Sequence, residues 1–127
     1  MPELPELTMP AETTARLEEV RRTFAALRCQ AGATADPEQK DRLHRMSAKL
    51  LEGGARPLKP GYPQHLTGRE IDVLAVVGVG ATNSEAAQRL GVSTETVKGY
   101  LRTAMHKLQA TNRYSAVQSA RRFRLIP

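Results

Sequence analysis

The sequence predicts an all-α fold, in which an N-terminal helical hairpin precedes a four-helix domain that contains a helix-turn-helix. Three observations support this fold. Apolar residues recur at spacings of three and four along most of the chain, which is the period of a helix rather than of a strand. Aromatic residues make up only 4% of the chain, whereas strands are enriched in them. Helix-capping sequences stand in front of several of the apolar segments.

The N-terminal half is expected to form two helices. Residues 1–10 contain three prolines and are predicted to be an extended lead-in. The segment from Ala11 to about Gln30 has the helical period, and the small residues that follow break it. Asp36 as N-cap and Pro37 at the first helical position begin a second helix. The pair Gly53-Gly54 is expected to end it.

Each of these two helices carries one apolar stripe that needs a covering surface. Two short amphipathic helices cannot bury both stripes alone. They would pack either on the C-terminal half of the chain or on the same hairpin of a second subunit. The second subunit is favoured because a linker follows the hairpin. The stripe residues are Leu17, Val20, Phe24 and Leu27 on the first helix, and Leu43, Met46 and Leu50 on the second.

The linker divides the chain into three parts. Residues 53–64 contain three prolines and three glycines, which is the composition of a boundary between folded units. Residues 1–52 are therefore expected to be the helical hairpin, which serves oligomerisation or contact with a partner. Residues 65–127 are expected to be the helix-turn-helix domain.

Four helices are predicted within this C-terminal part. Thr67-Gly68-Arg69-Glu70 is a capping box, in which the first and last side chains bond each other's backbone amides. Thr82-Asn83-Ser84-Glu85 is a second one, and Ser93 is a single N-cap. The predicted helices run from Thr67 to Gly78, from Thr82 to Leu90, from Thr94 to about Leu108, and from Arg113 to Arg122.

The second and third of these helices have the residue spacing of a helix-turn-helix. Counting Asn83 as the first place, place five needs a small side chain because the second helix passes over it, and Ala87 occupies it. Place nine is the tight turn, where Gly91 can adopt a positive φ angle. The places that must be apolar are four, eight, ten, fifteen and eighteen, and they hold Ala86, Leu90, Val92, Val97 and Tyr100.

A set of short motifs accompanies this spacing. They are Leu66-Thr67-Gly68-Arg69-Glu70, the stretch from Gly80 to Ala87, Thr96-Val97-Lys98, Lys107-Leu108, Asn112-Arg113 and Ala116-Val117. With these motifs, residues 66–118 resemble the LuxR-type (LuxR/FixJ-like) DNA-binding domain of bacterial transcription regulators. The resemblance covers about half of the chain. It implies a fold of four helices, in which the middle two read DNA and the last often serves as a dimer surface.

One side of the segment Thr94–Leu108 is predicted to pack in the core, and the opposite side to enter the major groove of DNA. Val97, Leu101, Ala104 and Leu108 share the core side. N-terminal residues of the second helix meet base edges in this mode of binding. Lys98 and Arg102 lie one helical turn apart, and can probe neighbouring base pairs or phosphates. The residues of the exposed side are Thr94, Glu95, Lys98, Gly99, Arg102, Thr103 and His106.

The resemblance assigns roles to some of these positions. It implies that Lys98, Gly99 and Arg102 face bases and that Thr96 meets a phosphate. Gly99 offers no side chain for reading, and a glycine inside a helix costs about 0.5–1 kcal/mol relative to alanine. It either lets the backbone approach DNA closely or marks a position that tolerates a small residue.

Four further residues are candidates for contacts with phosphates. Thr82 and Asn83 begin a helix, where exposed backbone amides attract anions. Lys107 and Arg113 flank the end of the Thr94–Leu108 helix. For each of them, an ordinary solvated side chain is the alternative.

The distribution of charge supports a polyanionic partner. The chain has a formal charge of +6. Residues 1–64 hold 10 basic and 9 acidic side chains, whereas residues 65–127 hold 9 basic and 4 acidic ones. The positive excess therefore lies almost entirely in the helix-turn-helix part, where it indicates a nucleic-acid partner.

Several other classes of protein are not expected. The three histidines are scattered without the spacing of metal ligands or of a catalytic pair, so no enzyme, metal site or cofactor is predicted. The few aromatic residues do not favour stacking on single strands. The apolar stretch Val73–Ala81 is shorter than the about 20 residues that span a membrane. The start of the chain lacks a signal peptide, so we expect a cytoplasmic protein, in which Cys29 is a packed thiol.

These observations predict a transcription regulator that binds duplex DNA sequence-specifically, as a dimer, with the helix Thr94–Leu108 in the major groove. Either the hairpin or the last helix would form the dimer surface. One alternative is an adaptor that sequesters another regulator or the transcription machinery, although an adaptor does not need Lys98 and Arg102 to stay exposed. Another is a promoter-recognition domain of a sigma factor. The target promoter, the direction of regulation and the inducing signal are not readable.

Overall fold

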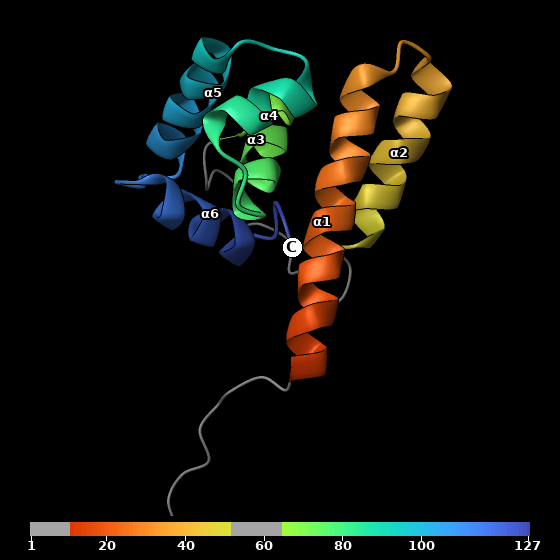
Figure 1. Ribbon diagram of the computed structural model, residues 1–127, viewed down its shortest axis with the longest axis horizontal. Helices are drawn as coiled ribbons and strands as arrows, with labels where there is room; N and C mark the ends of the chain where they lie inside the picture. The colour runs from red at the N-terminus through yellow and green to blue at the C-terminus, as the bar shows by residue number, and fades with distance from the viewer. Residues whose placement is uncertain (1–10, 52–64) are drawn as a thin grey trace, which may run out of the picture.

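The computed structural model describes residues 11–51 and 65–127, and its regular elements there are all α-helices. The predicted all-α fold, with a hairpin before four helices, is confirmed (Figure 1). The predicted lead-in 1–10, the linker 53–64 and the Gly53-Gly54 helix end lie outside the described residues. The helices are α1 (Ala11–Ala33), α2 (Pro37–Lys49), α3 (Gly68–Gly78), α4 (Asn83–Leu90), α5 (Thr94–Lys107) and α6 (Arg113–Arg122).

Helices α1 and α2 form the hairpin and lie side by side (Figure 1). Helix α1 continues to Ala33, three residues beyond the predicted end at Gln30. Helix α2 begins as predicted, with the side chain of Asp36 accepting a hydrogen bond from the amide of Glu38 at 3.1 Å and Pro37 at the first position. Helix α2 touches α1 and no other helix within 11–51 and 65–127.

The apolar stripe predicted for α2 is partly wrong. Leu43 is buried, but Met46 is 46% exposed. Ser47 takes the inward position, and its hydroxyl group donates a hydrogen bond to the carbonyl oxygen of His44 at 2.8 Å. The face that α2 turns toward α1 therefore follows an i, i+4 row from Leu43 to Ser47, whereas the sequence pattern favoured the i, i+3 row to Met46.

Helix α1 packs against α3 and α4 of the same chain. Phe24 and Ala25 of α1 are each 2% exposed and belong to one core with Val73 and Leu74 of α3. The expectation that a second subunit covers the stripe of α1 is therefore wrong for this central part. Sequence periodicity shows which face of a helix is apolar, but it does not identify the surface that covers it.

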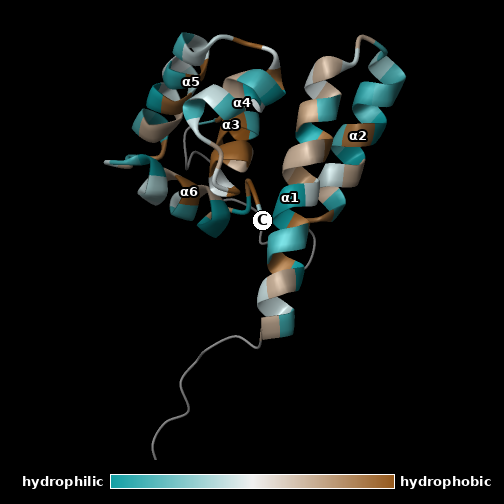
Figure 2. Cartoon of the chain, in the orientation of Figure 1, coloured by the Kyte–Doolittle hydropathy of each residue, from teal (hydrophilic) through white to brown (hydrophobic). Residues whose placement is uncertain are grey.

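Helix α3 is the centre of the C-terminal part. Its residues from Asp72 to Val77 are all buried, and α1, α4, α5 and α6 pack around it. Figure 2 shows apolar residues concentrated on α3, whereas α2 and α6 are largely hydrophilic. None of the helices in the described ranges is both long enough and apolar enough to cross a membrane.

A buried ion pair joins the hairpin to the helix-turn-helix part. Nε of Arg28 on α1 lies 2.6 Å from Oδ1 of Asp72 on α3, and Nη2 of Arg28 donates to the carbonyl oxygen of Gly68 at 2.9 Å. Nη1 of Arg69 lies 3.7 Å from the other carboxylate oxygen of Asp72. Burial raises the pKa of the Asp72 carboxyl group, and the positive charges of Arg28 and Arg69 oppose that shift.

Cys29 lies beside this ion pair and is partly buried, as expected for a packed thiol. Burial and the negative charge of Asp72 raise the pKa of its thiol group. This shift disfavours the thiolate, which is the reactive form of a cysteine.

Breaking the buried pair is expected to destabilise the whole fold. Asp72→Asn leaves the guanidinium group of Arg28 poorly compensated in a buried place, and we expect the free energy of unfolding to fall by about 3–5 kcal/mol. Urea unfolding followed by circular dichroism measures this change. Asp41→Asn is the control, because it breaks an exposed pair with Arg45 on α2 and is expected to cost about 0.5 kcal/mol or less. Equal losses in the two variants would contradict the role of the buried pair.

Candidate nucleic-acid interface

Helices α4 and α5 form the predicted helix-turn-helix. Gly91 ends α4 in the left-handed conformation, with φ 68° and ψ 33°, as the spacing predicted. The amide of the next residue, Val92, donates to the carbonyl oxygen of Ala87 at 3.0 Å and closes the turn. The hydroxyl group of Ser93 then accepts a hydrogen bond from the amide of Thr96 at 3.1 Å and starts α5. Both helix ends at the turn are thus satisfied locally.

The first helix of the pair also has its predicted cap. The amide of Glu85 donates to the Thr82 hydroxyl oxygen at 3.1 Å, and the amide of Thr82 donates to a carboxylate oxygen of Glu85 at 3.3 Å. This confirms the capping box and fixes the point at which α4 begins. Within the same domain, the box of Thr67 and Glu70 at the start of α3 is confirmed too.

The inward side of α5 is as predicted. Val97 and Ala104 are fully buried, and Leu101 is 8% exposed. Tyr100 is only partly buried against the same core. The outward side holds the predicted reading residues, of which Glu95, Thr96, Lys98, Arg102, Thr103 and His106 are exposed, while Thr94 and Gly99 are half-buried.

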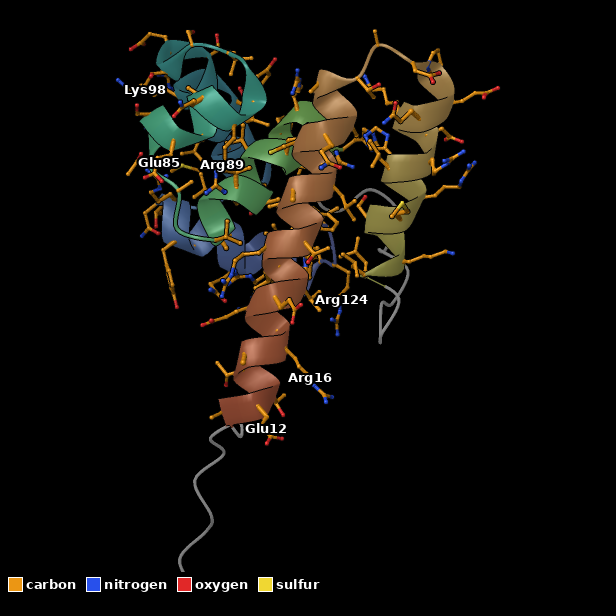
Figure 3. All side chains as sticks on the ribbon, turned by 45° about the vertical axis from the view of Figure 1, so that its right-hand side comes forward. Glu12, Arg16, Glu85, Arg89, Lys98 and Arg124 are labelled. Atoms are coloured by element: carbon orange, nitrogen blue, oxygen red, sulfur yellow. The ribbon has the colours of Figure 1, made fainter. Side chains whose placement is uncertain are left out.

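The outward side of α5 is free of the hairpin. Helix α5 contacts α3, α4 and α6, and within the two described ranges it contacts neither α1 nor α2. Figure 3 shows Lys98 pointing away from the hairpin, on the far side of the domain. A partner as wide as duplex DNA can therefore approach this side without displacing any of the six described helices.

The charged groups on this side are weakly held. Nζ of Lys98 lies 3.2 Å from a carboxylate oxygen of Glu95, but both side chains are largely exposed. Arg102 has no hydrogen-bond or ion-pair partner among residues 11–51 and 65–127. Exposed pairs contribute little to stability, so these cations can exchange their present surroundings for phosphates or base edges. The hydroxyl group of Thr103 donates to the carbonyl oxygen of Gly99 at 3.0 Å.

Lys107 is placed differently from the other predicted contacts. Its ammonium group donates to Oε1 of Glu70 at 2.7 Å and to the carbonyl oxygen of His65 at 3.1 Å. The side chain of Lys107 is 20% exposed and that of Glu70 is 2% exposed. Lys107 thus joins the end of α5 to the start of α3. The sequence held no local signal for this contact, because the two residues are 37 positions apart.

This pair has a definite effect on the titration of Glu70. Burial alone would raise the pKa of the Glu70 carboxyl group, but the hydrogen bonds from Lys107 and Thr67 outweigh it and lower that pKa below its usual value of 4.5. The ionised form of Glu70 therefore stabilises the folded state above that value. This contribution is lost as the pH falls through the lowered pKa.

Arg113 is the first residue of α6 and lies near the start of α4. Its Nη2 atom donates to the carbonyl oxygen of Ala81 at 3.2 Å, and this contact brings the start of α6 to the start of α4. The structure therefore brings Arg113 close to the start of α4, where Thr82 and Asn83 lie. Within the part of the chain that the structure describes, no cluster of side chains could hold a metal ion.

Removing the ammonium group of Lys107 is expected to reverse the direction in which the pKa of Glu70 is shifted. In Lys107→Met, burial raises the pKa of Glu70, and the loss in unfolding free energy at pH 7 is about 1.5–3 kcal/mol, the range for a hydrogen bond to a charged group. The loss should shrink at pH 4, because Glu70 is then partly protonated. Urea unfolding at both pH values measures it, with Lys98→Met as the exposed control. A loss that is the same at pH 7 and pH 4 would contradict this assignment.

Gly99 can be tested by adding one methyl group. A Cβ atom built there meets no atom within 4 Å, so Gly99→Ala is expected to stabilise the helix by about 0.5–1 kcal/mol. Thermal unfolding measures the gain, and DNA affinity separates the two explanations of the glycine. If the backbone approaches DNA closely, Gly99→Ala weakens binding although it stabilises the fold. If a small residue is merely tolerated, affinity is unchanged.

Several known proteins have a segment that is similar in sequence to this part of the chain. Residues 64–120 match the GerE family, described as bacterial regulatory proteins of the luxR family. The HTH-type transcriptional activator RamA of Corynebacterium glutamicum is 42% identical over 113 residues, which are 89% of this chain and 39% of RamA. The HTH-type transcriptional regulator AlkS of Alcanivorax borkumensis is 39% identical over 76 residues, or 60% of this chain and 9% of AlkS. The response regulator RamR of Streptomyces coelicolor is 37% identical over 73 residues, or 58% of this chain and 32% of RamR.

The chain thus spans about two fifths of the length of RamA and less of the other two relatives. No solved structure matches it. The similarity to RamA is longer than the family segment, so it includes residues of the hairpin as well. The resemblance predicted for residues 66–118 is confirmed: residues 64–120 form a helix-turn-helix domain of the luxR family of bacterial regulatory proteins.

Proposed function

We propose that this protein binds duplex DNA through the outward side of α5 and regulates transcription. The observation that carries the proposal is the position of Lys98 and Arg102, which are exposed on the one helix of the pair that no part of the hairpin contacts. The printed names of the relatives, which include transcriptional activators and regulators, support the same function.

In the proposed complex, α5 lies in the major groove. Its exposed and half-buried residues Thr94, Glu95, Lys98, Gly99, Arg102 and Thr103 would face base edges. Thr96, together with Thr82, Asn83 and Arg113, would hold phosphates. Lys107 has a smaller part in this proposal than the sequence suggested, because a phosphate contact would compete with its ion pair to Glu70.

Binding as a dimer is part of the proposal. Two copies of α5 that read neighbouring half-sites on one face of DNA would lie about 34–36 Å apart, which is one helical turn. The division into hairpin, linker and helix-turn-helix domain also remains a proposal. In it, residues 1–52 have a protein-contact role rather than a second DNA-binding role, since their basic and acidic side chains nearly balance.

An adaptor that sequesters another regulator is the second candidate function. One observation favours it. The side of α2 that faces away from α1 contacts no other helix of the described residues, and it carries Met46, a large apolar side chain that is 46% exposed. Such an adaptor would keep its partner when Lys98 and Arg102 are neutralised, whereas a DNA reader would lose DNA.

The test is DNA binding by Lys98→Ala, Arg102→Ala and the double variant, on a duplex selected from a random pool and measured by fluorescence anisotropy. Each single change is expected to cost about 1–3 kcal/mol of binding free energy if it removes a base contact. If Lys98 and Arg102 contact phosphates instead, the double variant should have a salt dependence that is weaker by about two units of slope.

Arg16→Ala is the matched control, because Arg16 is exposed on the far part of α1 (Figure 3). Unchanged binding by a folded double variant would exclude α5 as the reading helix. Sedimentation of the complex gives the number of chains on each duplex, and a single chain on a full site would exclude the dimer.

A further inference from the structure

A cleft in two neighbouring parts lies along α1, where this helix faces the turn after α3. One part has a volume of about 480 Å³ and is lined by Glu18, Arg21, Arg22, Gly78, Val79 and Arg121. A second part of about 430 Å³ lies farther along α1 and shares Arg22 and Val79 with the first. We call the two parts together the α1 cleft. Each part has the volume of a site for a small molecule.

The first part of the α1 cleft has an excess of positive charge. Its one carboxylate, Glu18, is paired with Arg22 at 3.2 Å. Arg21 donates from Nε to the backbone oxygen of Pro127 at 3.0 Å, and Arg121 donates from Nη2 to the carbonyl oxygen of Gly78 at 2.9 Å. The acceptor of Arg121 is a neutral carbonyl group, so within the described residues Arg121 has no carboxylate partner.

Arg121 also has an unused donor. Its Nε atom is buried and has no hydrogen-bond partner among residues 11–51 and 65–127. Burial and the nearby charge of Arg21 lower the pKa of the Arg121 guanidinium group. Two like charges that share a cleft are in an unfavourable state that a bound anion would relieve.

The second part of the α1 cleft has an apolar wall. Ala25, Ala26 and Val79 line it, together with the partly buried Cys29. A further cation, Arg89 of α4, stands at this part, and Figure 3 shows it between α4 and α1. An occupant that fills both parts would therefore combine an anionic head with a short apolar group.

We propose that the α1 cleft binds a small organic anion, whose head contacts Arg21 and Arg121 and whose apolar group lies along Ala25, Ala26 and Val79. The head group is a phosphate or a carboxylate, since guanidinium groups bind both. This site is independent of the proposed DNA contacts, because α1 and α5 do not touch in the described part of the chain.

The test is an NMR titration of the full ¹⁵N-labelled chain with n-hexyl phosphate. We expect saturable shifts of the amide signals of Arg21, Gly78 and Val79, with half-saturation at about 1 mM or below. Inorganic phosphate and hexanol should each bind at least about tenfold more weakly, because each lacks one of the two parts. Hexanoate in a parallel titration decides between the two head groups. Absence of saturable shifts with both hexyl compounds, or shifts confined to α5, would overturn the proposal.

Variants of the α1 cleft make the assignment specific. Arg21→Gln and Arg121→Met are each expected to weaken binding of hexyl phosphate by at least about tenfold. Arg16→Gln is the control, since Arg16 lies on the same helix, is exposed and is not part of the cleft. Unchanged affinity in both folded variants would overturn the proposal.

A second variant keeps the test valid if the arginine variants unfold. Ala26 is an exposed helical residue at the wall of the cleft, so Ala26→Glu adds a repelling carboxylate without disturbing the core. It should weaken binding of hexyl phosphate at least about tenfold, whereas Ala15→Glu, at an exposed position outside the cleft, should leave it unchanged. Equal affinities of these two variants would contradict an anion in this cleft.

Discussion

The pairing of Arg28 with Asp72 is the contact on which the arrangement of the two halves depends. A carboxylate that is 4% exposed is unfavourable without a cation beside it, and the cation comes from α1, 44 residues away along the chain. The guanidinium group also holds the carbonyl oxygen of Gly68, the first residue of α3. The position of α1 on α3 is therefore set by directional polar bonds as well as by the apolar contacts of Phe24. Apolar contacts alone are not directional, so they would let α1 shift along α3.

The same chemistry changes how the charge of the domain is distributed. Two of the four acidic side chains of residues 65–127, Glu70 and Asp72, are buried in ion pairs with Lys107 and Arg28. The other two, Glu85 and Glu95, are exposed on α4 and α5. The surface potential is thus set by fewer acids than the sequence contains. The buried carboxylates reduce the positive potential around Lys98 and Arg102 only a little, because each of them is neutralised by its own cation.

Much of the fold was predictable because its signals are local. Capping boxes, the positive φ angle of Gly91 and the inward residues of α5 depend on neighbours within a few positions, and these predictions are confirmed. The predictions that failed concern contacts between distant segments. The choice of Ser47 over Met46 and the surface that covers α1 are decided by helices that meet only in three dimensions. The ion pair of Lys107 with Glu70, for which the sequence held no signal, forms in the same way. The exposed side of α5 followed from periodicity, whereas the α1 cleft did not, because its lining comes from four separate helices and a turn.

The length of α1 has a mechanical consequence. Its 23 residues make a rod of about 35 Å, and its first turns project beyond the other described helices (Figure 1). The other end of this rod is clamped to α3, which also supports α4 and α5. A force on the projecting end is therefore transmitted as a torque to the helix pair that carries Lys98 and Arg102. The projecting end is thus connected to the helix pair through α3, and the Arg28–Asp72 pair is one of the contacts that hold α1 there.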